Sequence, residues 1–483
     1  MGSRQGPGGS RARPRAACAL TLLLALACGG AEEARPDLVL VSVDTLRADR
    51  LGIYGAESAP EGREAFSPGW LAERGTVFEQ CWSPAGQTLP ALASFWTGRP
   101  PLEHGAVTNF HRLQGFRSRA EDLAEAGWLC LGRAANATLQ PGTGIAAGFE
   151  RTPGGWRAGP WTYEERMAEE LLELAAPAVR GRRPLLLWAH HMAPHQPYEP
   201  PLELLEDPGP GPLRAGKELL QDLERQGPPV DPVLARRLRT LYDAEIRVSA
   251  RNLRRLLEGL DRLYREAGRG GLLENAVVVF FSDHGEELGD RNAYFPHAKS
   301  LYAGVIRVPL VIAGPGWAAG RRDPRPLGLD EVLPWVLEGR EPSRRYHVAA
   351  WRSSYFAVRD ERWTLIHSPL PEEERRLGPW EPLLPADGGR YPYPAVALFD
   401  RNADPGEHHD LSVEYPEETR RLLGALRAWY EELVPPARYR PAAGVQDAVL
   451  EQLGYAGSAA SQGPAGGLRG LEGLPWRPEE WRP

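Results

Sequence analysis

The sequence predicts an α/β protein in which a doubly wound, mostly parallel sheet is followed by a small antiparallel sheet and a helix. Three observations support this fold class. Four short, almost wholly apolar runs are typical of strands buried on both faces. Amphipathic stretches with helical spacing lie between them, and such alternation produces parallel sheets covered by helices. Near residue 346 the pattern changes to closely spaced strands, which indicates an antiparallel sheet.

The expected elements follow in order along the chain. Buried strands are predicted at residues 38–43, 185–189, 276–281 and 308–312. Amphipathic helices are predicted at 120–126, 164–175 and 232–267. In the C-terminal part, 355–359 and 362–366 form a hairpin-like pair, 400–407 is rich in turn residues, and 416–433 is helical.

Changes in composition divide the chain into four parts. Residues 1–34 are a leader and tether, and 35–340 form the large α/β domain. Residues 341–440 form a C-terminal α+β subdomain, and 441–483 are a tail rich in Gly and Pro.

The composition limits the classes of function. The 483 residues include 57 basic and 64 acidic side chains, a net charge of −7, and 42% are apolar. These values exclude wholesale disorder and a polytopic membrane protein. The mild acidity and the lack of a long basic run argue against a nucleic-acid partner. Almost every basic residue is Arg, which draws attention to the two lysines, Lys217 and Lys299.

The first 34 residues have the features of an export signal. Arginines precede an apolar run at 16–27 that is too short to span a bilayer, which takes about 20 residues. Residues 24–28 resemble a bacterial lipobox ending at Cys28, while 25–27 also fit a simple cleavage site. We therefore expect a protein of the bacterial cell envelope, periplasmic or lipid-anchored through Cys28, with an uncleaved anchor as the remaining alternative.

Two cysteines, Cys81 and Cys130, remain in the body of the chain. An oxidising compartment would permit a disulfide between them. A pair of free buried thiols fits the sequence equally well.

Acidic and histidine side chains follow two of the predicted strands. Asp44 comes directly after strand 38–43, and Asp283 and His284 come after strand 276–281. Ligands of parallel sheets bind beyond the carboxyl ends of the strands. Asp and neutral His suit a divalent metal ion. The alternatives are a helix N-cap for Asp44 and a surface loop for the Asp-His pair.

Thr88 begins a stretch that enters a helix and ends at Gly98. A hydroxyl at a helix N-terminus favours anions, and a neighbouring metal would make it a nucleophile. The alternative for Thr88 is an ordinary N-cap.

Histidines cluster after strand 185–189, as His190, His191 and His195. His297 and Lys299 follow the Asp-His pair. Such donors suit an oxyanion and a leaving oxygen. The three clustered histidines could instead form a second metal site, or each could be a satisfied core residue.

The order of these motifs resembles the sulfatase branch of the alkaline phosphatase superfamily. The motifs are V-D-T-L-R-A-D, T-L-P-x-x-A-S-x-x-T-G, P-H-x-P-Y, S-D-H-G-E, H-x-K and R-V-P-L, and the L-F-D segment at 398–407 extends the resemblance over residues 36–435. The resemblance implies an α/β sandwich that hydrolyses sulfate or phosphate esters at a divalent metal. We expect one ion, of Mn, Zn, Ca or Mg.

The resemblance also implies residue roles. The implied metal ligands are Asp44, Thr88, Asp283 and His284. The implied catalytic residues are Thr88 as nucleophile, with His190, His195, His297 and Lys299 around the ester. Lys299 fits a role that Arg does not fill.

The chain departs from the sulfatase pattern at the nucleophile. Sulfatases carry Cys or Ser in C/S-x-P-x-R, which is oxidised to formylglycine, whereas this chain has Thr88 and, in place of the Arg, Leu92. Thr45 replaces a second acidic ligand. No formylglycine is therefore expected, and a Thr nucleophile resembles the phosphodiesterase and phosphonoester hydrolase relatives.

Three functions stay open at this point. The first is a Thr88-dependent hydrolase of phosphodiester or phosphonate esters, and the second is sulfate-ester hydrolysis. The third is a non-catalytic surface protein that binds anionic glycans or lipids. The expected partner is an anionic ester (glycan, lipid or small molecule), with no nucleic acid and with membrane contact only through Cys28. Specificity is expected in the insertions at 142–160 and 207–232.

Overall fold

A computed structural model describes residues 35–150, 156–158, 164–206, 210–226, 230–290, 297, 300–351, 355–369, 395–436, 439, 440 and 442. The leader, Lys299 and nearly all of the tail lie outside these residues, as do parts of both insertions. No helix in the described part combines the length and the apolar character needed to cross a bilayer.

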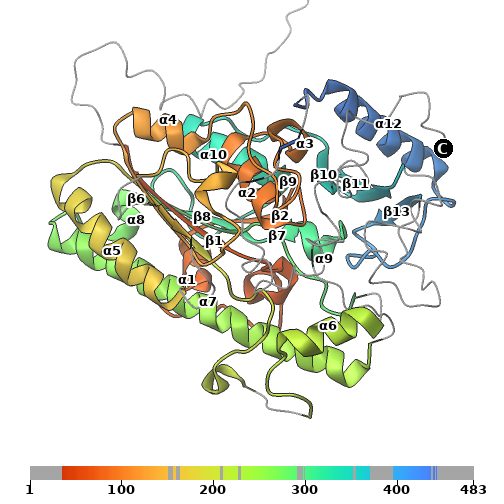
Figure 1. The fold of residues 1–483 in the computed structure, drawn as a ribbon, viewed down its shortest axis with the longest axis horizontal. Coiled ribbons are helices and arrows are strands. Elements are labelled where there is room, and N and C mark those ends of the chain that lie inside the picture. The colour runs from red at the N-terminus through yellow and green to blue at the C-terminus, as the bar shows by residue number, and fades with distance from the viewer. Residues whose placement is uncertain are drawn as a thin grey trace, which may run out of the picture.

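A large mixed sheet forms the centre of the molecule (Figure 1). Its strands, in spatial order, are β4 (Trp156–Ala158), β3 (Leu129–Ala134), β5 (Leu185–His191), β1 (Asp37–Val43), β6 (Ala276–Ser282), β8 (Leu310–Ala313), β2 (Gly75–Trp82) and β7 (Arg307–Val308), with β9 (Arg321–Gly328) also paired to β2. The run from β4 to β6 is parallel throughout. The predicted mostly parallel sheet is confirmed in this half.

The other half of the sheet differs from the expectation. The run at 308–312, predicted as one strand, is divided at Pro309 into β7 and β8. Proline has no N–H to give to a strand ladder, so the ladder is interrupted there. Moreover, β8 runs antiparallel to β6 and β2, and β7 runs antiparallel to β2.

Helices cover both faces of this sheet, as the alternating side chains of β1 require. Val39, Val41 and Val43 belong to the core beneath α1 (Pro68–Arg74), α5 (Glu164–Gly181), α7 (Pro232–Glu266) and α8 (Leu272–Asn275). Leu38 and Leu40 face the core beneath α2 (Thr88–Thr97), α4 (Arg119–Glu125) and α10 (Leu329–Glu338). Leu220 and Leu223 of α6 (Lys217–Gln226) join the first of these cores, whereas the short helices α3 (Pro101–His104) and α9 (Ala303–Ile306) lie outside both. The doubly wound arrangement is therefore confirmed.

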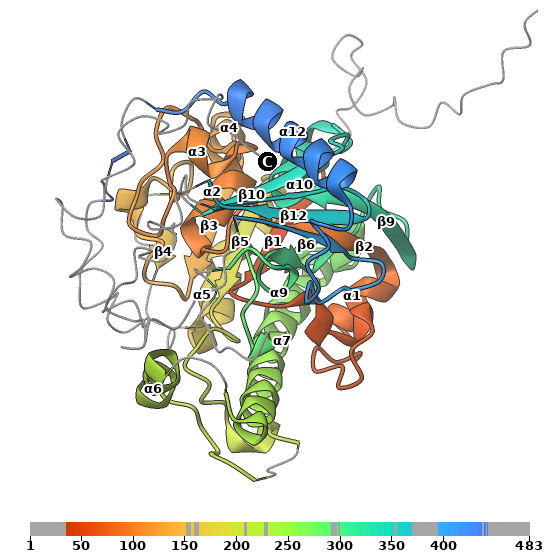
Figure 2. The same ribbon diagram turned by 90° about the vertical axis from the view of Figure 1, so that its right-hand side faces the viewer.

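The C-terminal part forms a four-stranded antiparallel sheet with one helix (Figure 2). The strands are β10 (His347–Trp351), β11 (Tyr355–Arg359), β12 (Trp363–His367) and β13 (Val396–Asp400), and the helix is α12 (Pro416–Glu432). Leu422 and Leu426 of α12 pack on Phe356 of one face. The other face packs on Trp82 and α9. The sheet plus helix is confirmed, while the exact domain limits remain a prediction.

The two body cysteines are free thiols. Cys81 lies in β2 and Cys130 in β3, and both are buried. Burial raises the pKa of Cys81 above its usual range and that of Cys130 to about 12. Of the two alternatives left by the sequence, the structure shows the unbridged one.

Candidate active site

The carboxyl ends of the parallel strands meet at one edge of the sheet, and the polar residues found there come from separate parts of the chain. Asp44 follows β1, while Asp283 and His284 follow β6, which pairs directly with β1. All three side chains are fully buried. The Nε2 atom of His284 lies 3.6 Å from Asp44 Oδ1 and 3.5 Å from Asp283 Oδ2. One ligand atom from each residue falls within 4.8 Å of the others.

The charges in this cluster fit a cation. Asp44 Oδ1 and Asp283 Oδ2 are buried, and no described residue donates a hydrogen bond to either atom. Burial and the charge of Asp44 raise the pKa of Asp283 well above its usual value. Burial opposes ionisation of Asp44 as well, but the His190 hydrogen bond and the nearby His195 and His284 hold its pKa low. Two buried carboxylates with open oxygens and an imidazole are the donor set of a divalent metal.

The backbone that follows β1 and β6 orients the side chains of Asp283 and His284. Thr45 has a φ of 55° and donates its N–H to Asp283 Oδ1 at 3.3 Å. The Nδ1 atom of His284 lies 3.0 Å from the Gly285 carbonyl, which leaves Nε2 directed at the carboxylates. Fixing one ring nitrogen in this way is how proteins orient metal-binding histidines.

Thr88 lies at the first position of α2, within reach of the metal-ligand cluster. Its Oγ1 atom lies 3.4 Å from Asp44 Oδ2 and 3.4 Å from His284 Nε2. The N-cap of α2 is Gln87, so the alternative of Thr88 as an ordinary N-cap is wrong. The N–H of Leu89 donates to Asn109 Oδ1 at 2.9 Å. The helix thus presents the hydroxyl to the cluster.

Asn136 belongs to the site and was not predicted. It follows β3, and its Nδ2 donates to Asp44 Oδ2 at 2.7 Å and lies 3.5 Å from Thr88 Oγ1. The available signal was the same one that identified Asp44, a polar residue just beyond a strand. Strand 129–134 carries Gly132 and Arg133 among its apolar residues. Because of this mixed pattern the strand was not predicted, and the polar residue after it was not recognised.

The histidine cluster divides between two faces of the sheet. His190 points toward the site, with Nε2 3.4 Å from Asp44 Oδ2 and Nδ1 2.9 Å from Ser42 Oγ. His191 points the other way, with Nδ1 3.0 Å from Glu164 Oε1. Consecutive strand residues alternate in direction, so they do not share one ion. The alternative of a second metal site at these histidines is therefore wrong.

His195 and His297 extend the site away from the carboxylates. The ring of His297 lies 4.5 Å from that of His284 and 5.0 Å from that of His195. Burial lowers the pKa of His195 and lowers that of His297 to about 4. The backbone N–H of His297 donates to Glu286 Oε1 at 2.8 Å. Lys299 lies outside the described residues, so its expected role stays a prediction.

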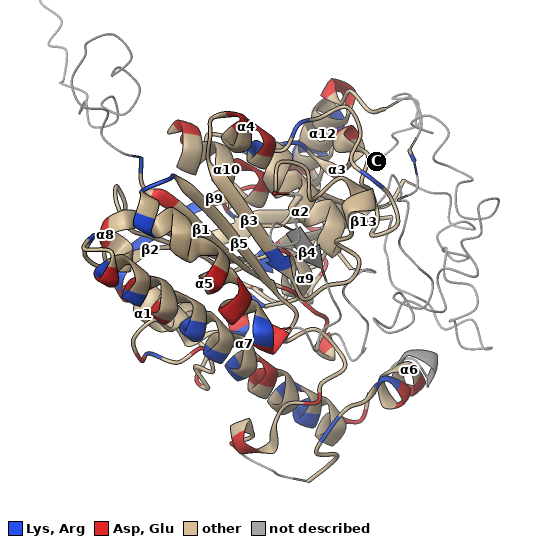
Figure 3. Cartoon of the chain, turned by 60° about the vertical axis from the view of Figure 1, so that its left-hand side comes forward, with Lys and Arg blue, Asp and Glu red and all other residues tan. Residues whose placement is uncertain are grey.

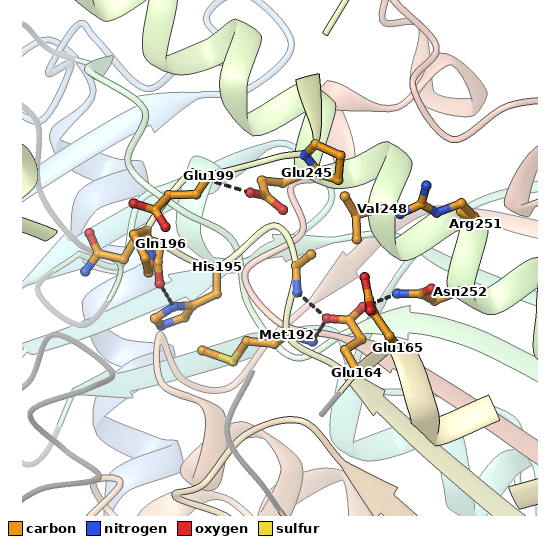
Figure 4. A pocket seen from close by; sticks show the side chains of 13 residues that line it. Glu164, Glu165, Met192, His195, Gln196, Glu199, Glu245, Val248, Arg251 and Asn252 are labelled. Atoms are coloured by element: carbon orange, nitrogen blue, oxygen red, sulfur yellow. Dashed lines mark hydrogen bonds between the residues drawn. The ribbon is translucent and has the colours of Figure 1, made fainter. Parts of the chain in front are cut away.

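A cavity of about 260 Å³ borders His195 (Figure 4). It lies between the N-terminus of α5, the segment after β5 and the middle of α7. Its lining comprises Glu164, Glu165, Met192, Ala193, His195, Gln196, Pro197, Glu199, Pro201, Glu245, Val248, Arg251 and Asn252.

Fold and site together define the class, an α/β protein with a doubly wound sheet and a buried Asp-Asp-His cluster whose donor atoms fit a divalent metal ion. Residues 36–338 match the model of the sulfatase family. The chain belongs to the sulfatase family.

Relatives of known activity are distant. The chain is 27% identical over 272 residues to a choline-sulfatase of Rhizobium meliloti, covering 48% of this chain and 47% of that one. It is 23% identical over 372 residues to an arylsulfatase of Clostridium perfringens, covering 63% and 74%. The chain thus spans about half the length of the first of these relatives and about three quarters of the second.

Solved structures share the fold at low identity. A phosphonate monoester hydrolase of Agrobacterium radiobacter has a TM-score of 0.56 at 18% identity, covering 82% of this chain and 96% of that one. A structure in complex with its substrate D-glucosamine-2-N,6-O-disulfate has a TM-score of 0.59 at 15% identity, covering 82% and 98%. At these identities the comparison shows the fold.

Proposed function

We propose that this chain is a metal-dependent hydrolase of phosphodiester or phosphonate esters that uses Thr88 as its nucleophile. The observation that carries the proposal is the position of Thr88 Oγ1, 3.4 Å from both Asp44 Oδ2 and His284 Nε2. A hydroxyl beside a metal-ligand cluster and at a helix N-terminus is well placed to attack an anionic ester.

Asp44, Asp283 and His284 would hold one divalent ion of Mn, Zn, Mg or Ca. When bound, the ion would lower the pKa of the Thr88 hydroxyl and offset negative charge on the ester. Thr88 Oγ1 forms a bond to phosphorus while the bond from phosphorus to the departing alcohol oxygen breaks, and the alcohol leaves with a proton. The other substituent stays on phosphorus. Water then cleaves the bond between Thr88 Oγ1 and phosphorus, which releases a phosphate monoester from a phosphodiester, or a phosphonate from a phosphonate ester, and restores the Thr88 hydroxyl. His195, His297 and Lys299 are proposed to bind the ester oxygens.

The nucleophile argues against formylglycine chemistry. That cofactor arises by oxidation of Cys or Ser, whereas the side chain of Thr88 would give a ketone rather than an aldehyde. The position of the supporting Arg is occupied by Leu92, which is fully buried in the core beneath α2.

The test compares turnover of bis(p-nitrophenyl) phosphate with turnover of p-nitrophenyl sulfate by the leaderless protein with added Mn²⁺ or Zn²⁺. We expect phosphodiester turnover that EDTA abolishes, that Thr88→Ala abolishes and that Thr88→Ser retains in part. Acid-quenched reactions with bis(p-nitrophenyl) phosphate should contain Thr88 that carries a p-nitrophenyl phosphoryl group, detected by mass spectrometry. Phosphodiester turnover by Thr88→Ala equal to that of the wild type would overturn the assignment of the nucleophile.

Sulfate-ester hydrolysis is the second candidate, because the curated relatives reported above are named as sulfatases. Turnover of p-nitrophenyl sulfate alone would favour it. The third reading, a protein that binds anionic glycans or lipids without turning them over, would be favoured by metal binding with no turnover of either ester.

Export remains a proposal that rests on the sequence of the leader alone. We propose that Cys28 is lipidated in the cell envelope, since residues 24–28 resemble a lipobox. Labelling of expressing bacteria with an alkyne palmitate should mark the wild type. The Cys28→Ala variant should be unlabelled.

A further inference from the structure

Apart from His195, the residues that line the cavity beside it, which we call the side pocket, are not used by the chemistry above. His195 belongs to both the side pocket and the site, because its ring also lies 5.0 Å from that of His297. A substituent of a bound ester would therefore have room there. This inference rests on the proposed ester hydrolysis.

Glu245 is the residue of the side pocket that is positioned to meet a ligand. It lies on α7, and its side chain is only 8% exposed. One carboxylate oxygen accepts the N–H of Glu199 at 2.8 Å, and no described residue donates to the other oxygen. Figure 4 shows the carboxyl groups of Glu245 and Glu199 on the side of the pocket opposite His195 and Met192. A buried carboxylate with an open oxygen facing a cavity is costly unless a positive partner arrives.

The charges around Glu245 are mostly negative. Glu164, Glu165 and Glu199 also line the side pocket, against one basic residue, Arg251. The guanidinium of Arg251 lies 3.7 Å from Glu203, outside the lining. Both carboxylate oxygens of Glu164 already accept hydrogen bonds, from Asn252 and from the backbone N–H groups of residues 192 and 193.

The rest of α7 is different in character. Basic and acidic side chains are mixed along its length (Figure 3). Many of them pair with a neighbour one turn away, as Arg265 does with Asp261 at 2.7 Å. The excess of carboxylates is therefore a feature of the side pocket and not of the helix.

Much of the remaining lining is apolar, with Met192, Pro197, Pro201 and Val248 beside the carboxylates and the polar Gln196 and Asn252. A hydrated metal ion is hardly stabilised by contact with apolar side chains. The alkyl groups around a nitrogen cation, in contrast, are stabilised when they are buried against them. We propose that the side pocket binds an organic ammonium group carried by the ester substrate, with Glu245 as its principal counter-charge.

The test uses two esters that differ only in charge, 2-(trimethylammonio)ethyl 4-nitrophenyl phosphate and its neutral-tailed isostere 3,3-dimethylbutyl 4-nitrophenyl phosphate. The assay is run at pH 8.5, because burial raises the pKa of Glu245 to about 8. We expect kcat/KM to favour the cationic ester by about tenfold or more, the size of one charge-assisted contact.

Glu245→Gln keeps the shape and the acceptor for Glu199 but removes the charge. It should bring the ratio of the two kcat/KM values close to one, mainly through KM. The matched control is Glu258→Gln, on the same helix but outside the lining, which should keep the wild-type ratio. Equal kcat/KM for the two esters in the wild type would overturn the inference and leave the proposed function standing.

A binding measurement tests the ammonium-binding pocket separately from the proposed ester hydrolysis. Titration calorimetry of both esters into Thr88→Ala needs no turnover. Preferential binding of the cationic ester that Glu245→Gln abolishes would support the side pocket even if the wild type hydrolysed neither ester. Equal affinities for the two esters would overturn it.

Discussion

Asn136 shows how one residue can position both a ligand and a nucleophile. The N–H and the hydroxyl of Thr138 donate to Asn136 Oδ1 at 2.9 Å and 2.6 Å. This fixes the amide so that Nδ2 faces Asp44 Oδ2 at 2.7 Å. One oxygen of Asp44 is thus bound by protein while Oδ1 stays open, and Asn136 acts as a positioning residue.

Loss of this amide should slow the proposed reaction. Asn136→Ala removes a hydrogen bond to a charged group, worth about 1.5–3 kcal/mol, so kcat/KM on the phosphodiester should fall roughly 10- to 100-fold. Thr138→Val removes only one of the two donors that hold the amide and should cost less. Rescue by Asn136→Gln is not expected, because the longer side chain displaces the amide. Unchanged kcat/KM and metal affinity in Asn136→Ala would contradict this role.

Glu245 also gives a stability prediction that does not depend on any substrate. Burial raises its pKa from 4.5 to about 8, and Glu164 and Glu199 add to the rise, while the Glu199 N–H opposes it. Glu165 and Arg251 also face the pocket. Because the pKa is raised in the folded state, folding favours the protonated form. The resulting penalty is absent below about pH 4.5 and grows as the pH rises to about 8.

Glu245→Gln should therefore raise the Tm at pH 9 by a few degrees and leave it almost unchanged at pH 5. Differential scanning fluorimetry across this range measures the effect. Glu258→Gln, which changes a half-exposed side chain of the same helix, should change the Tm by the same small amount at pH 5 and at pH 9. An equal rise in Tm at pH 5 and pH 9 for Glu245→Gln would show that ionisation of Glu245 does not destabilise the fold.

At the scale of elements, the turn after β6 shows why a glycine directly follows the candidate metal ligand His284. A Cβ on Gly285 would lie 2.1 Å from the carbonyl oxygen of Gly304. The N–H of Gly285 also bonds the carbonyl of Val305, which ties the turn to the segment that leads into β7. Since backbone crowds the space, the turn must shift to accept a methyl group.

Gly285→Ala should therefore displace His284 and weaken metal binding, with loss of most of the activity at limiting metal. The measurement is activity as a function of Mn²⁺ or Zn²⁺ concentration. Gly424→Ala is the matched control, because Gly424 is in α12 with open space around it. That change should raise stability by about 0.5–1 kcal/mol and leave the metal dependence unaltered. Wild-type metal affinity in Gly285→Ala would contradict the packing argument.

The elements differ in how well they could be predicted. Strands β1, β5 and β6 are continuous apolar runs, and α7 has a clear helical period, so all four were found. Strand β2 carries Glu79 and Gln80, and β9 carries two prolines and exposed arginines. Their place in the sheet depends on the pairing of β2 with β9 and with β8, and these pairings are long-range contacts. Periodicity in a short window does not report such contacts.

At the scale of the whole molecule, the C-terminal sheet supports the segment that follows the site. Arg359 of β11 donates to the carbonyl of Leu301 at 2.7 Å, and Glu407 accepts the N–H of Ala303 at 2.7 Å. Arg359 and Glu407 also lie 3.4 Å apart and are both buried. The segment after His297 is thus fixed by residues that lie 58 and 104 positions further along the chain.

Glu407→Gln should lower both stability and turnover, although Glu407 is not among the site residues. It leaves Arg359 buried without its counter-charge, which costs about 3–5 kcal/mol. Thermal unfolding and kcat are the two readouts, and the exposed Glu414→Gln is the control. A Tm close to that of the wild type would show that the C-terminal sheet does not brace this segment.

The sequence alone determined the fold class, the α/β body with its antiparallel C-terminal sheet, and four of the residues that meet at the site. Asp44, Thr88, Asp283 and His284 could be found because each follows an apolar strand or begins a helix, which is local information. Only the tertiary structure decided that His190 faces the site while His191 faces Glu164, that Asn136 completes the cluster, and that Glu245 borders a pocket beside His195. These facts depend on which strands and helices become neighbours, and that is set by the packing of segments far apart in the chain.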